Sequence, residues 1–251
     1  MVGGKALAYR EAGEGPALVL VHGIGSGSAS WLFQLEGLAA RFRMIAWDAP
    51  GYGDSDAFSI ERPQPADYAR ALSVLTGALQ LKSFVLVAQS LGGLIAGAYA
   101  RIFPTLPALL LISPAGGYAG DLSKVEERLR TLDSLGADGL AEKRSGGMLS
   151  PNPPPIALEL VRWNYRRIRR EGYRQAAYCL AQGDLREDAP HYAGRVLVAC
   201  GSADTVTPEA GCRDIARRFP KSAYQFLPDL GHASQIEGPD EVNRMIADFA
   251  C

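Results

Sequence analysis

The sequence predicts an α/β fold in which a mostly parallel sheet is covered by helices on both faces. Three observations support this prediction. Short apolar runs recur along the chain, as expected for strands that are buried on both sides. Segments with helical spacing of apolar residues alternate with these runs. With 251 residues, 47% of them hydrophobic, the chain can bury one large core, with or without an inserted lobe.

Seven runs are expected to form strands, each bounded by glycine, proline or polar turn residues. The first stops at the Gly-Glu-Gly-Pro turn of residues 13–16, and the second stops at a glycine-rich loop that begins with His22. The expected strands are Ala6–Glu11, Ala17–Val21, Arg43–Trp47, Phe84–Gln89, Leu109–Ser113, Arg195–Cys200 and Ala223–Leu227.

Helices are expected between the strands, where apolar residues repeat on one face. The first follows Ser28 or Ser30 as its N-cap. The helix after the Phe84–Gln89 strand stops at Pro104, because proline cannot continue a helix. The other expected helices are Ala66–Gln80, Leu122–Leu135, Ile156–Arg170, Tyr173–Ala181, Glu209–Arg218 and Pro239–Phe249.

The alternation of strands and helices stops between Gly116 and Pro190. Helical patterns replace the buried strands there, with a proline-rich stretch at 151–155 among them. We interpret residues 117–190 as an inserted helical cap, which has the size of a small domain. Residues 1–116 and 191–251 then form the core domain.

Composition, charge and cysteine spacing exclude several classes of protein. The net charge is −1 with both signs mixed along the chain, so no nucleic-acid partner is expected. No apolar run is long enough to span a membrane, and the N-terminus lacks the apolar region of a signal peptide. The four cysteines are isolated and have no metal-ligand spacing, so neither a metal site nor a disulfide is expected. We therefore expect a cytoplasmic protein.

Ser90 lies where an apolar strand meets a glycine-containing helix. The surrounding residues, Ala88-Gln89-Ser90-Leu91-Gly92, match the G-x-S-x-G nucleophile elbow except at the first position. Such a turn exposes the serine hydroxyl at the carboxyl edge of a sheet, because its small neighbours leave space around it. The same serine could alternatively only cap the following helix.

Two more polar residues, Asp204 and His232, directly follow strands near the C-terminus. The carboxyl ends of parallel strands share one edge, so both are expected near Ser90. Neutral imidazole can accept the proton of a serine hydroxyl, and a carboxylate can orient that imidazole. Asp204 could instead be a turn or capping residue, and His232 an ordinary loop histidine. Their joint occurrence at one edge favours a catalytic triad of Ser90, His232 and Asp204.

An acyl-transfer site also needs backbone amides that stabilise an oxyanion. The amide of Leu91, after the nucleophile, and that of Ile24, in the glycine-rich loop, are the expected donors. Gly23 and Gly25 permit the unusual backbone of that loop and are expected to border the substrate. Gln89 could hydrogen-bond the substrate, orient the elbow or simply pack.

The same glycine-rich loop partly matches a dinucleotide-binding fingerprint, with Asp48 at the end of the next strand. Ser28 stands where that fingerprint needs its third glycine, and His22 has no role in it. No cofactor is therefore expected.

Together these motifs resemble the α/β-hydrolase superfamily, in its capped, cofactor-free group. The matching segments are His22-Gly23 with its loop, residues 48–55, residues 88–93, Gly201-Ser202-Ala203-Asp204 and Gly231-His232. The resemblance covers nearly the whole chain and implies that residues 48–55 form a structural turn. It departs from the family at the start, where a shortened opening hairpin implies that one edge strand is missing. It also departs at Ala88-Gln89, where the family commonly has Gly-His.

Within that superfamily, the loop before Trp31 resembles those of enol-lactonases and of hydrolases that act on meta-cleavage products. The latter cleave C–C bonds in acidic dienones and often carry tryptophan after the catalytic histidine. Ala233 occupies that position here, and Gln89 replaces a common asparagine. Both differences favour ester or lactone hydrolysis over C–C cleavage.

The arginine-rich stretch from residue 162 to residue 170 could recognise a substrate carboxylate, because guanidinium groups pair with carboxylates. Helical geometry directs most of these arginines to solvent. Arg167, at the border between the two faces, is the one expected to turn inward. Trp163 and Tyr165 are the expected apolar lining of the pocket. The residues expected to point outward are Arg162, Arg166 and Arg169.

The sequence therefore predicts a serine hydrolase that cleaves a small, mainly apolar ester or lactone through an acyl-enzyme on Ser90. The alternatives are a C–C hydrolase of vinylogous keto-acids and a ligand receptor of low turnover on the same fold. The expected partner is a small-molecule substrate, without nucleic acid or membrane; the oligomeric state, a homodimer included, is left open.

Overall fold

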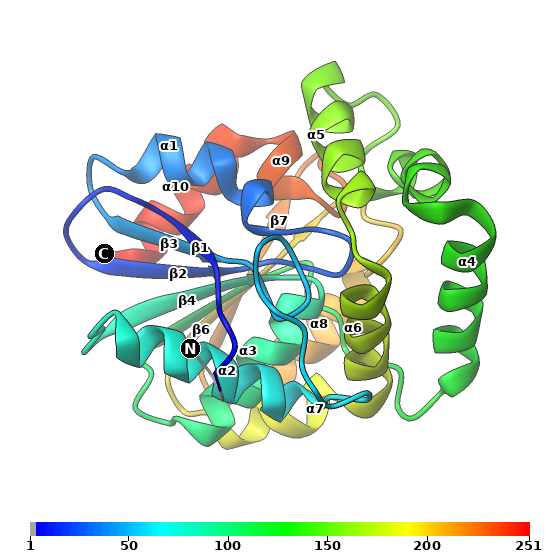
Figure 1. The fold of residues 1–251 in the computed structure, drawn as a ribbon. Coiled ribbons are helices and arrows are strands. Elements are labelled where there is room, and N and C mark those ends of the chain that lie inside the picture. Colours follow the sequence, from blue (N-terminus) through cyan, green and yellow to red (C-terminus); the bar gives the residue numbers. More distant parts are fainter. Residues whose placement is uncertain (1–3) are drawn as a thin grey trace.

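The computed structural model describes residues 4–251, which form a seven-stranded sheet with the order β1-β3-β2-β4-β5-β6-β7. Strand β1 is antiparallel to β3, and every other neighbouring pair is parallel. This confirms the predicted α/β fold and its mostly parallel sheet (Figure 1). The strands are β1 (Tyr9–Ala12), β2 (Ala17–Val21), β3 (Arg43–Trp47), β4 (Phe84–Gln89), β5 (Ala108–Ile112), β6 (Arg195–Gly201) and β7 (Ser222–Leu227).

The first strand begins later than the predicted Ala6–Glu11. The amide of Ala8 donates a 2.8 Å hydrogen bond to the side chain of Ser55, in the turn after β3. Because this donor is already used, pairing with β3 starts only at Tyr9, which lies opposite Trp47.

Helices connect most of the strands. Short helices α7 and α9 were not predicted, and both lie in segments dominated by turn residues. The α-helices are α1 (Leu32–Leu38), α2 (Pro65–Ala78), α3 (Leu91–Ile102), α4 (Leu122–Arg144), α5 (Pro155–Arg166), α6 (Arg170–Gln182), α7 (Leu185–Asp188), α8 (Glu209–Arg218), α9 (Ser234–Glu237) and α10 (Pro239–Ala250). The 3₁₀ turns are η1 (Ser28–Trp31), η2 (Gly146–Met148) and η3 (Ala189–His191).

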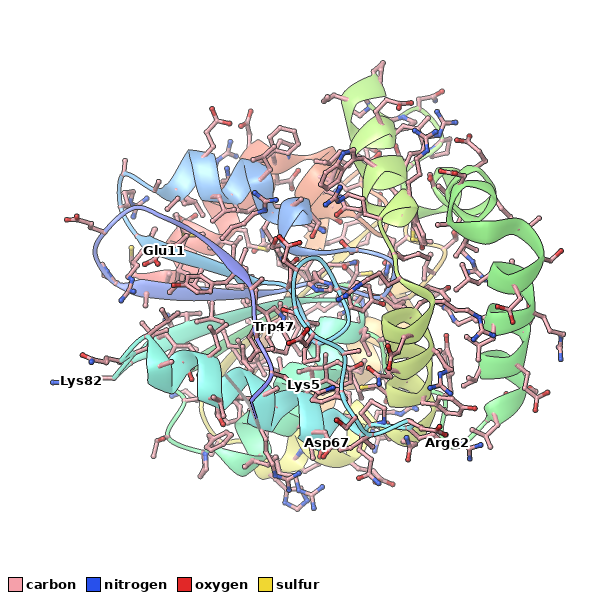
Figure 2. All side chains as sticks on the ribbon, in the orientation of Figure 1. Lys5, Glu11, Trp47, Arg62, Asp67 and Lys82 are labelled. Atoms are coloured by element: carbon pink, nitrogen blue, oxygen red, sulfur yellow. The ribbon has the colours of Figure 1, made fainter. Side chains whose placement is uncertain are left out.

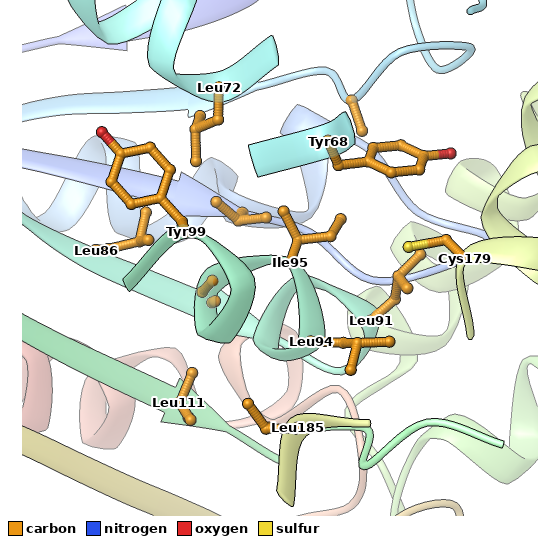
Figure 3. Packing of buried hydrophobic residues seen from close by; sticks show 14 of the residues in the cluster. Tyr68, Leu72, Leu86, Leu91, Leu94, Ile95, Tyr99, Leu111, Cys179 and Leu185 are labelled. Carbon is orange, nitrogen blue, oxygen red and sulfur yellow. The ribbon is translucent and has the colours of Figure 1, made fainter. Parts of the chain in front are cut away.

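Different helices bury the two faces of the sheet. In β2, Leu18 and Leu20 belong to the apolar cluster formed with α1 and α10, whereas Val19 and Val21 belong to the one formed with α2 and α3. Figure 3 shows the second cluster, in which α2 and α3 meet β4 and β5. The continuous apolar runs in the sequence follow from strands that are buried on both faces.

The outer surface carries the charged groups. Lys82, before β4, projects away from the molecule in Figure 2, while Trp47, at the end of β3, is fully buried. Within residues 4–251, no helix has both the length and the apolar character needed to cross a bilayer.

Residues 113–194, between β5 and β6, are called the insertion here. Its helices α4, α5 and α6 stand together at the right of the sheet in Figure 1. Helix α4 runs on to Arg144, beyond the predicted end at Leu135, across a break at Gly136 (φ 65°, ψ −177°). The insertion shares one continuous apolar cluster with the α2 and α3 side of the sheet. A division into domains at residues 117 and 190 stays a prediction.

The helix predicted over Ile156–Arg170 ends at Arg166 instead, and α6 begins at Arg170. The turn between them lets α6 pack closely on the loop after β3. A Cβ atom on Gly172 would lie 2.0 Å from the carbonyl oxygen of Gly51, so the two backbones touch. This contact holds the insertion against the core.

Candidate active site

Ser90 occupies the sharp turn between β4 and α3. Its backbone has φ 54° and ψ −120°, a conformation that non-glycine residues rarely adopt. Its amide donates to the carbonyl of Ile112 at 3.1 Å, and its own carbonyl accepts from Gly93 and Ala115, each at 2.9 Å. A Cβ atom on Gly92 would lie 2.4 Å from the carbonyl oxygen of Val21, so this position cannot carry a side chain. These contacts hold Ser90 in the elbow geometry that its sequence predicts.

Asp204 and His232 meet at the same edge of the sheet. His232 Nδ1 lies 3.0 Å from Asp204 Oδ2, and both side chains are almost fully buried. The other carboxylate oxygen, Oδ1, accepts hydrogen bonds from the amides of Val206 (2.8 Å) and Thr207 (2.9 Å). The sequence offered two alternative roles for Asp204, and the structure shows both. Asp204 stabilises the turn that follows it, and its carboxylate contacts the imidazole of His232.

The charge state of Asp204 follows from these contacts. Burial alone would raise the pKa of this carboxyl, but hydrogen bonds and the charge of His232 outweigh it and lower the pKa. The group therefore stays ionised near neutral pH, as a residue that orients an imidazole must.

Thr207, which was not among the predicted site residues, also touches this pair. Its Oγ1 lies 2.8 Å from Asp204 Oδ2, 3.1 Å from His232 Nδ1 and 3.1 Å from the carbonyl oxygen of Ser113. In the sequence, the only indication of this contact is that Thr207 follows Asp204 by three residues, and the same spacing is common in ordinary turns. The hydroxyl fixes the carboxylate and the ring in one arrangement.

Two further side chains hold the loop that carries His232. Gln89 Nε2 donates to the carbonyl of His232 at 3.0 Å, so Gln89 connects the elbow to the histidine. The carboxylate of Glu237 accepts from the amides of Gly231 (2.7 Å) and Ser150 (2.9 Å). Because Ser150 belongs to the insertion, the second contact couples the histidine loop to it.

The loop after β2 lies opposite Ser90. His22 Nε2 accepts from the amide of Ala49 at 3.0 Å, so its Nδ1 carries the hydrogen and donates to the carbonyl of Gly23 at 2.8 Å. Burial lowers the pKa of His22, which favours this neutral form. His22 therefore fixes the loop through its backbone.

The two predicted oxyanion donors both border Ser90. Ile24 lines the same cavity as Ser90, and its amide meets no acceptor within residues 4–251. Leu91 begins α3, where the first amides of a helix lack intrahelical acceptors. Two N–H groups are thus free to bind a developing negative charge.

A small cavity of about 30 Å³ lies over Ser90, enough for about one water molecule. Gly25 has φ 77°, and a Cβ atom there would lie 2.4 Å from the Tyr165 ring. Tyr165 therefore borders the cavity from the side of the insertion. The lining residues are Ile24, Gly25, Ser26, Gln89, Ser90, Met148, Val161, Asn164, Tyr165, His232, Ala233, Gln235 and Ile236.

The structure brings Ser90, Asp204, His232, Ile24, Leu91, Gly23, Gly25, Gln89 and Tyr165 together, but it places Trp163 and Arg167 elsewhere. Trp163 is 41% exposed and borders an outer apolar groove between α5 and α1. The Arg167 guanidinium stacks 4.6 Å from the centre of the Trp163 ring. Because α5 ends at Arg166, the helical geometry that directed Arg167 inward does not extend to it. The prediction that these two residues line the pocket is therefore corrected.

The structure also bears on the alternative that the glycine-rich loop and Asp48 bind a dinucleotide. Asp48 Oδ1 accepts a 2.8 Å hydrogen bond from the amide of Ser28, at the start of η1. This carboxylate therefore stabilises the loop from within. Among residues 4–251, no group of three or more histidine, cysteine, aspartate or glutamate side chains is arranged to hold a metal ion.

Comparison with known proteins gives the family context of this geometry. The model of the alpha/beta hydrolase family matches residues 18–245. The dihydrolipoyllysine-residue acetyltransferase component of the acetoin cleaving system of Pseudomonas putida is 30% identical over 258 residues, which cover 99% of this chain and 67% of that protein. A 2-hydroxy-6-oxo-6-phenylhexa-2,4-dienoate hydrolase of Burkholderia cepacia is 26% identical over 254 residues, which cover 95% of this chain and 89% of that protein.

Solved structures of other proteins superpose on this chain over almost its full length. A thermophilic esterase from Thermogutta terrifontis superposes with a TM-score of 0.90 at 27% identity, covering 99% of this chain and 94% of that one. The enol-lactonase from Burkholderia xenovorans LB400 gives a TM-score of 0.90 at 24% identity, covering 99% and 97%, and shares the fold.

Proposed function

The chain belongs to the α/β-hydrolase family, and we propose that it is a serine hydrolase acting on a small, mainly apolar carboxylic ester or lactone. One observation carries the proposal: the imidazole of His232, bound to Asp204 at 3.0 Å, lines the same cavity as the Ser90 elbow. The apolar side chains among the lining residues support the substrate class; they are those of Ile24, Met148, Val161, Ala233 and Ile236. Likeness to the Thermogutta terrifontis esterase also supports it.

In the proposed reaction, Ser90 Oγ attacks the carbonyl carbon while His232 Nε2 accepts its proton. Asp204 holds the Nδ1–H tautomer and stabilises the imidazolium. The amides of Ile24 and Leu91 bind the oxyanion. The imidazolium then protonates the leaving oxygen, giving an acyl-enzyme and an alcohol, which stays attached when the substrate is a lactone. Water attacks the acyl-enzyme, His232 accepts its proton, and return of that proton to Ser90 releases the acid.

The nucleophile is tested by Ser90→Ala, with Ser83→Ala at an exposed position as the control. Turnover of p-nitrophenyl butyrate should fall by up to about 10⁶-fold in the first variant and stay unchanged in the second. A fluorophosphonate should label Ser90 in the parent protein, as located by mass spectrometry. Activity of Ser90→Ala close to that of the parent would show that the nucleophile lies elsewhere.

A second candidate function is C–C bond hydrolysis of a vinylogous keto-acid. It is favoured by the 26% identity to the Burkholderia cepacia dienoate hydrolase over 95% of this chain. Parallel assays with short p-nitrophenyl esters, lactones and a ring-fission dienoate separate the two. A kcat/KM for the dienoate that exceeds the ester values would favour this second function.

A further inference from the structure

Gln235, the second residue of α9, carries a buried side-chain amide that has no partner. The residue is only 2% exposed, and its Oε1 accepts no hydrogen bond. Several buried polar atoms lack a partner within residues 4–251, but Gln235 is the one of these residues that lines the cavity over Ser90. Buried amides are normally hydrogen-bonded, because an unpaired one is unfavourable. The amide of Gln235 is therefore available to a molecule that enters the cavity.

The backbone around Gln235 is held from two sides. Gln34 Nε2 donates to the carbonyl of Gln235 at 3.1 Å. The amide of Ala233 donates to the carbonyl of Met148, in the insertion, at 2.8 Å. These hydrogen bonds fix the segment that carries both His232 and Gln235, and they use no atom of the Gln235 side chain. The side-chain amide thus has a fixed base, while its oxygen remains free to bind a donor.

The other two side-chain amides in the cavity wall are already engaged. Gln89 Nε2 donates to the carbonyl of His232 at 3.0 Å, and Asn164 Nδ2 donates to the carbonyl of Leu160 at 2.8 Å. These bonds fix the orientation of both amide groups. The amide of Gln235 has no such bond among the described residues, so it can turn its acceptor oxygen towards a small donor.

The second half of the proposed reaction requires such an acceptor. The water that attacks the acyl-enzyme has two hydrogens, and His232 Nε2 can accept only one of them. The cavity has room for about one water molecule, so a water that enters it touches the lining residues. Gln235 Oε1 and His232 Nε2 together offer two acceptors, one for each hydrogen. This pair can hold the water in a single orientation beside Ser90.

We propose that Gln235 Oε1 binds the water molecule that hydrolyses the acyl-enzyme, an inference that rests on the proposed function. The water oxygen attacks the acyl carbon, one proton passes to His232 Nε2, and the carbonyl electron pair moves onto the oxyanion. The second hydrogen stays on the attacking oxygen, and Gln235 accepts its hydrogen bond. When the oxyanion collapses, the bond from the acyl carbon to Ser90 Oγ breaks. His232 then returns the proton to Oγ, and the acid is released.

The kinetic test separates acylation from deacylation. With p-nitrophenyl butyrate, p-nitrophenol leaves during acylation, before the water attacks. Gln235→Met has a side chain of similar length without the acceptor, so kcat should fall by about 10-fold. KM should fall by the same factor, because only deacylation is slowed, and kcat/KM should stay unchanged. A stoichiometric burst of p-nitrophenol should precede the steady state. Gln225→Met, on β7 and outside the cavity, should keep the parental kcat and KM.

A partition experiment tests the same step independently of how much protein is folded, because it counts only molecules that turn over. Methanol has a single O–H hydrogen, which His232 accepts, so it needs no second acceptor. In methanol–water mixtures, the ratio of methyl butyrate to butyric acid should therefore rise by about 10-fold in Gln235→Met and stay unchanged in Gln225→Met.

Two results would overturn the proposal. An unchanged partition ratio in Gln235→Met would show that the water does not depend on this amide. A loss of kcat/KM as large as the loss of kcat would show that Gln235 acts on the substrate or on the fold instead. Failure of the proposed function would be seen separately, as absent turnover of every ester together with an unlabelled Ser90.

Discussion

The side-chain amide of Gln89 donates a 3.0 Å hydrogen bond to the backbone carbonyl of His232, which lies 143 residues away in the sequence. Gln89, which precedes the proposed nucleophile, therefore holds the loop that carries the proposed base, His232. Gln89→Met removes the donor and leaves a buried carbonyl unpaired, so kcat should fall about 10-fold or more with little change in KM. Steady-state kinetics on p-nitrophenyl butyrate measure this. Gln225→Met, on β7, is the control, and an effect of equal size there would contradict the role assigned to Gln89.

Gly23 lies directly against the elbow. A Cβ atom at this position would be 2.6 Å from Gln89 Oε1 and 2.8 Å from Ser90 Cβ. Gly23→Ala should therefore displace the glycine-rich loop and lower kcat/KM by about 100-fold, as observed when an oxyanion donor is lost. Gly211→Ala, where nothing lies within 4 Å, should leave kcat/KM unchanged. If both variants kept parental kinetics, the loop would not need its close approach to Ser90.

Thr207 bridges Asp204 and His232. Thr207→Val keeps the shape of the side chain but removes the hydroxyl, so kcat should fall about 10-fold with KM unchanged. Thr207→Ser keeps the hydroxyl and should recover most of the rate. Thr205→Val, at an exposed position in the same loop, is the matched control. A serine variant as slow as the valine variant would mean that the methyl group matters, and not the hydrogen bonds.

The burial of His22 allows a prediction of how the free energy of unfolding depends on pH. Its folded-state pKa is lowered by burial, whereas the unfolded chain has the ordinary value of 6.5. Below pH 6.5 the unfolded state therefore binds a proton that the folded state does not. The free energy of unfolding should fall as pH decreases, by at most about 1.4 kcal/mol per pH unit from this group, until the folded pKa is reached. Urea unfolding between pH 8 and pH 5 measures this slope.

In that experiment the parent protein is compared with His22→Gln, which lacks the titrating imidazole ring. This variant should be less stable at pH 7 but should lose less stability on acidification than the parent protein. His191→Gln, at an exposed histidine, should keep the parental slope. Identical slopes for His22→Gln and the parent would assign the pH dependence to other groups.

Much of the fold could be predicted because its signals are local. Apolar runs between turn residues placed all seven strands, and the small residues around Ser90 predicted the elbow that its φ of 54° displays. Asp204 and His232 were found because each directly follows a strand, so topology alone brings them to one edge. The start of β1 was placed too early because Ala8 uses its amide in a distant turn, which no local pattern reveals.

The parts that could not be predicted depend on long-range contacts or on where helices end. Arg167 was expected to point inward on a helix that in fact stops at Arg166. Thr207 was not predicted, because its contact with His232 joins two loops that are separated by a helix and a strand in the sequence.

The small volume of the space over Ser90 has a kinetic consequence. A volume of about 30 Å³ holds about one water molecule, so an acyl group can enter only when the lining side chains, Tyr165 among them, have moved apart. Measured affinity is then the intrinsic affinity scaled by the fraction of molecules that are open at a given moment. Substituting a smaller side chain at position 165 should raise the association rate and broaden the range of acceptable molecules, but the proposed acyl-enzyme would then be less shielded from bulk water.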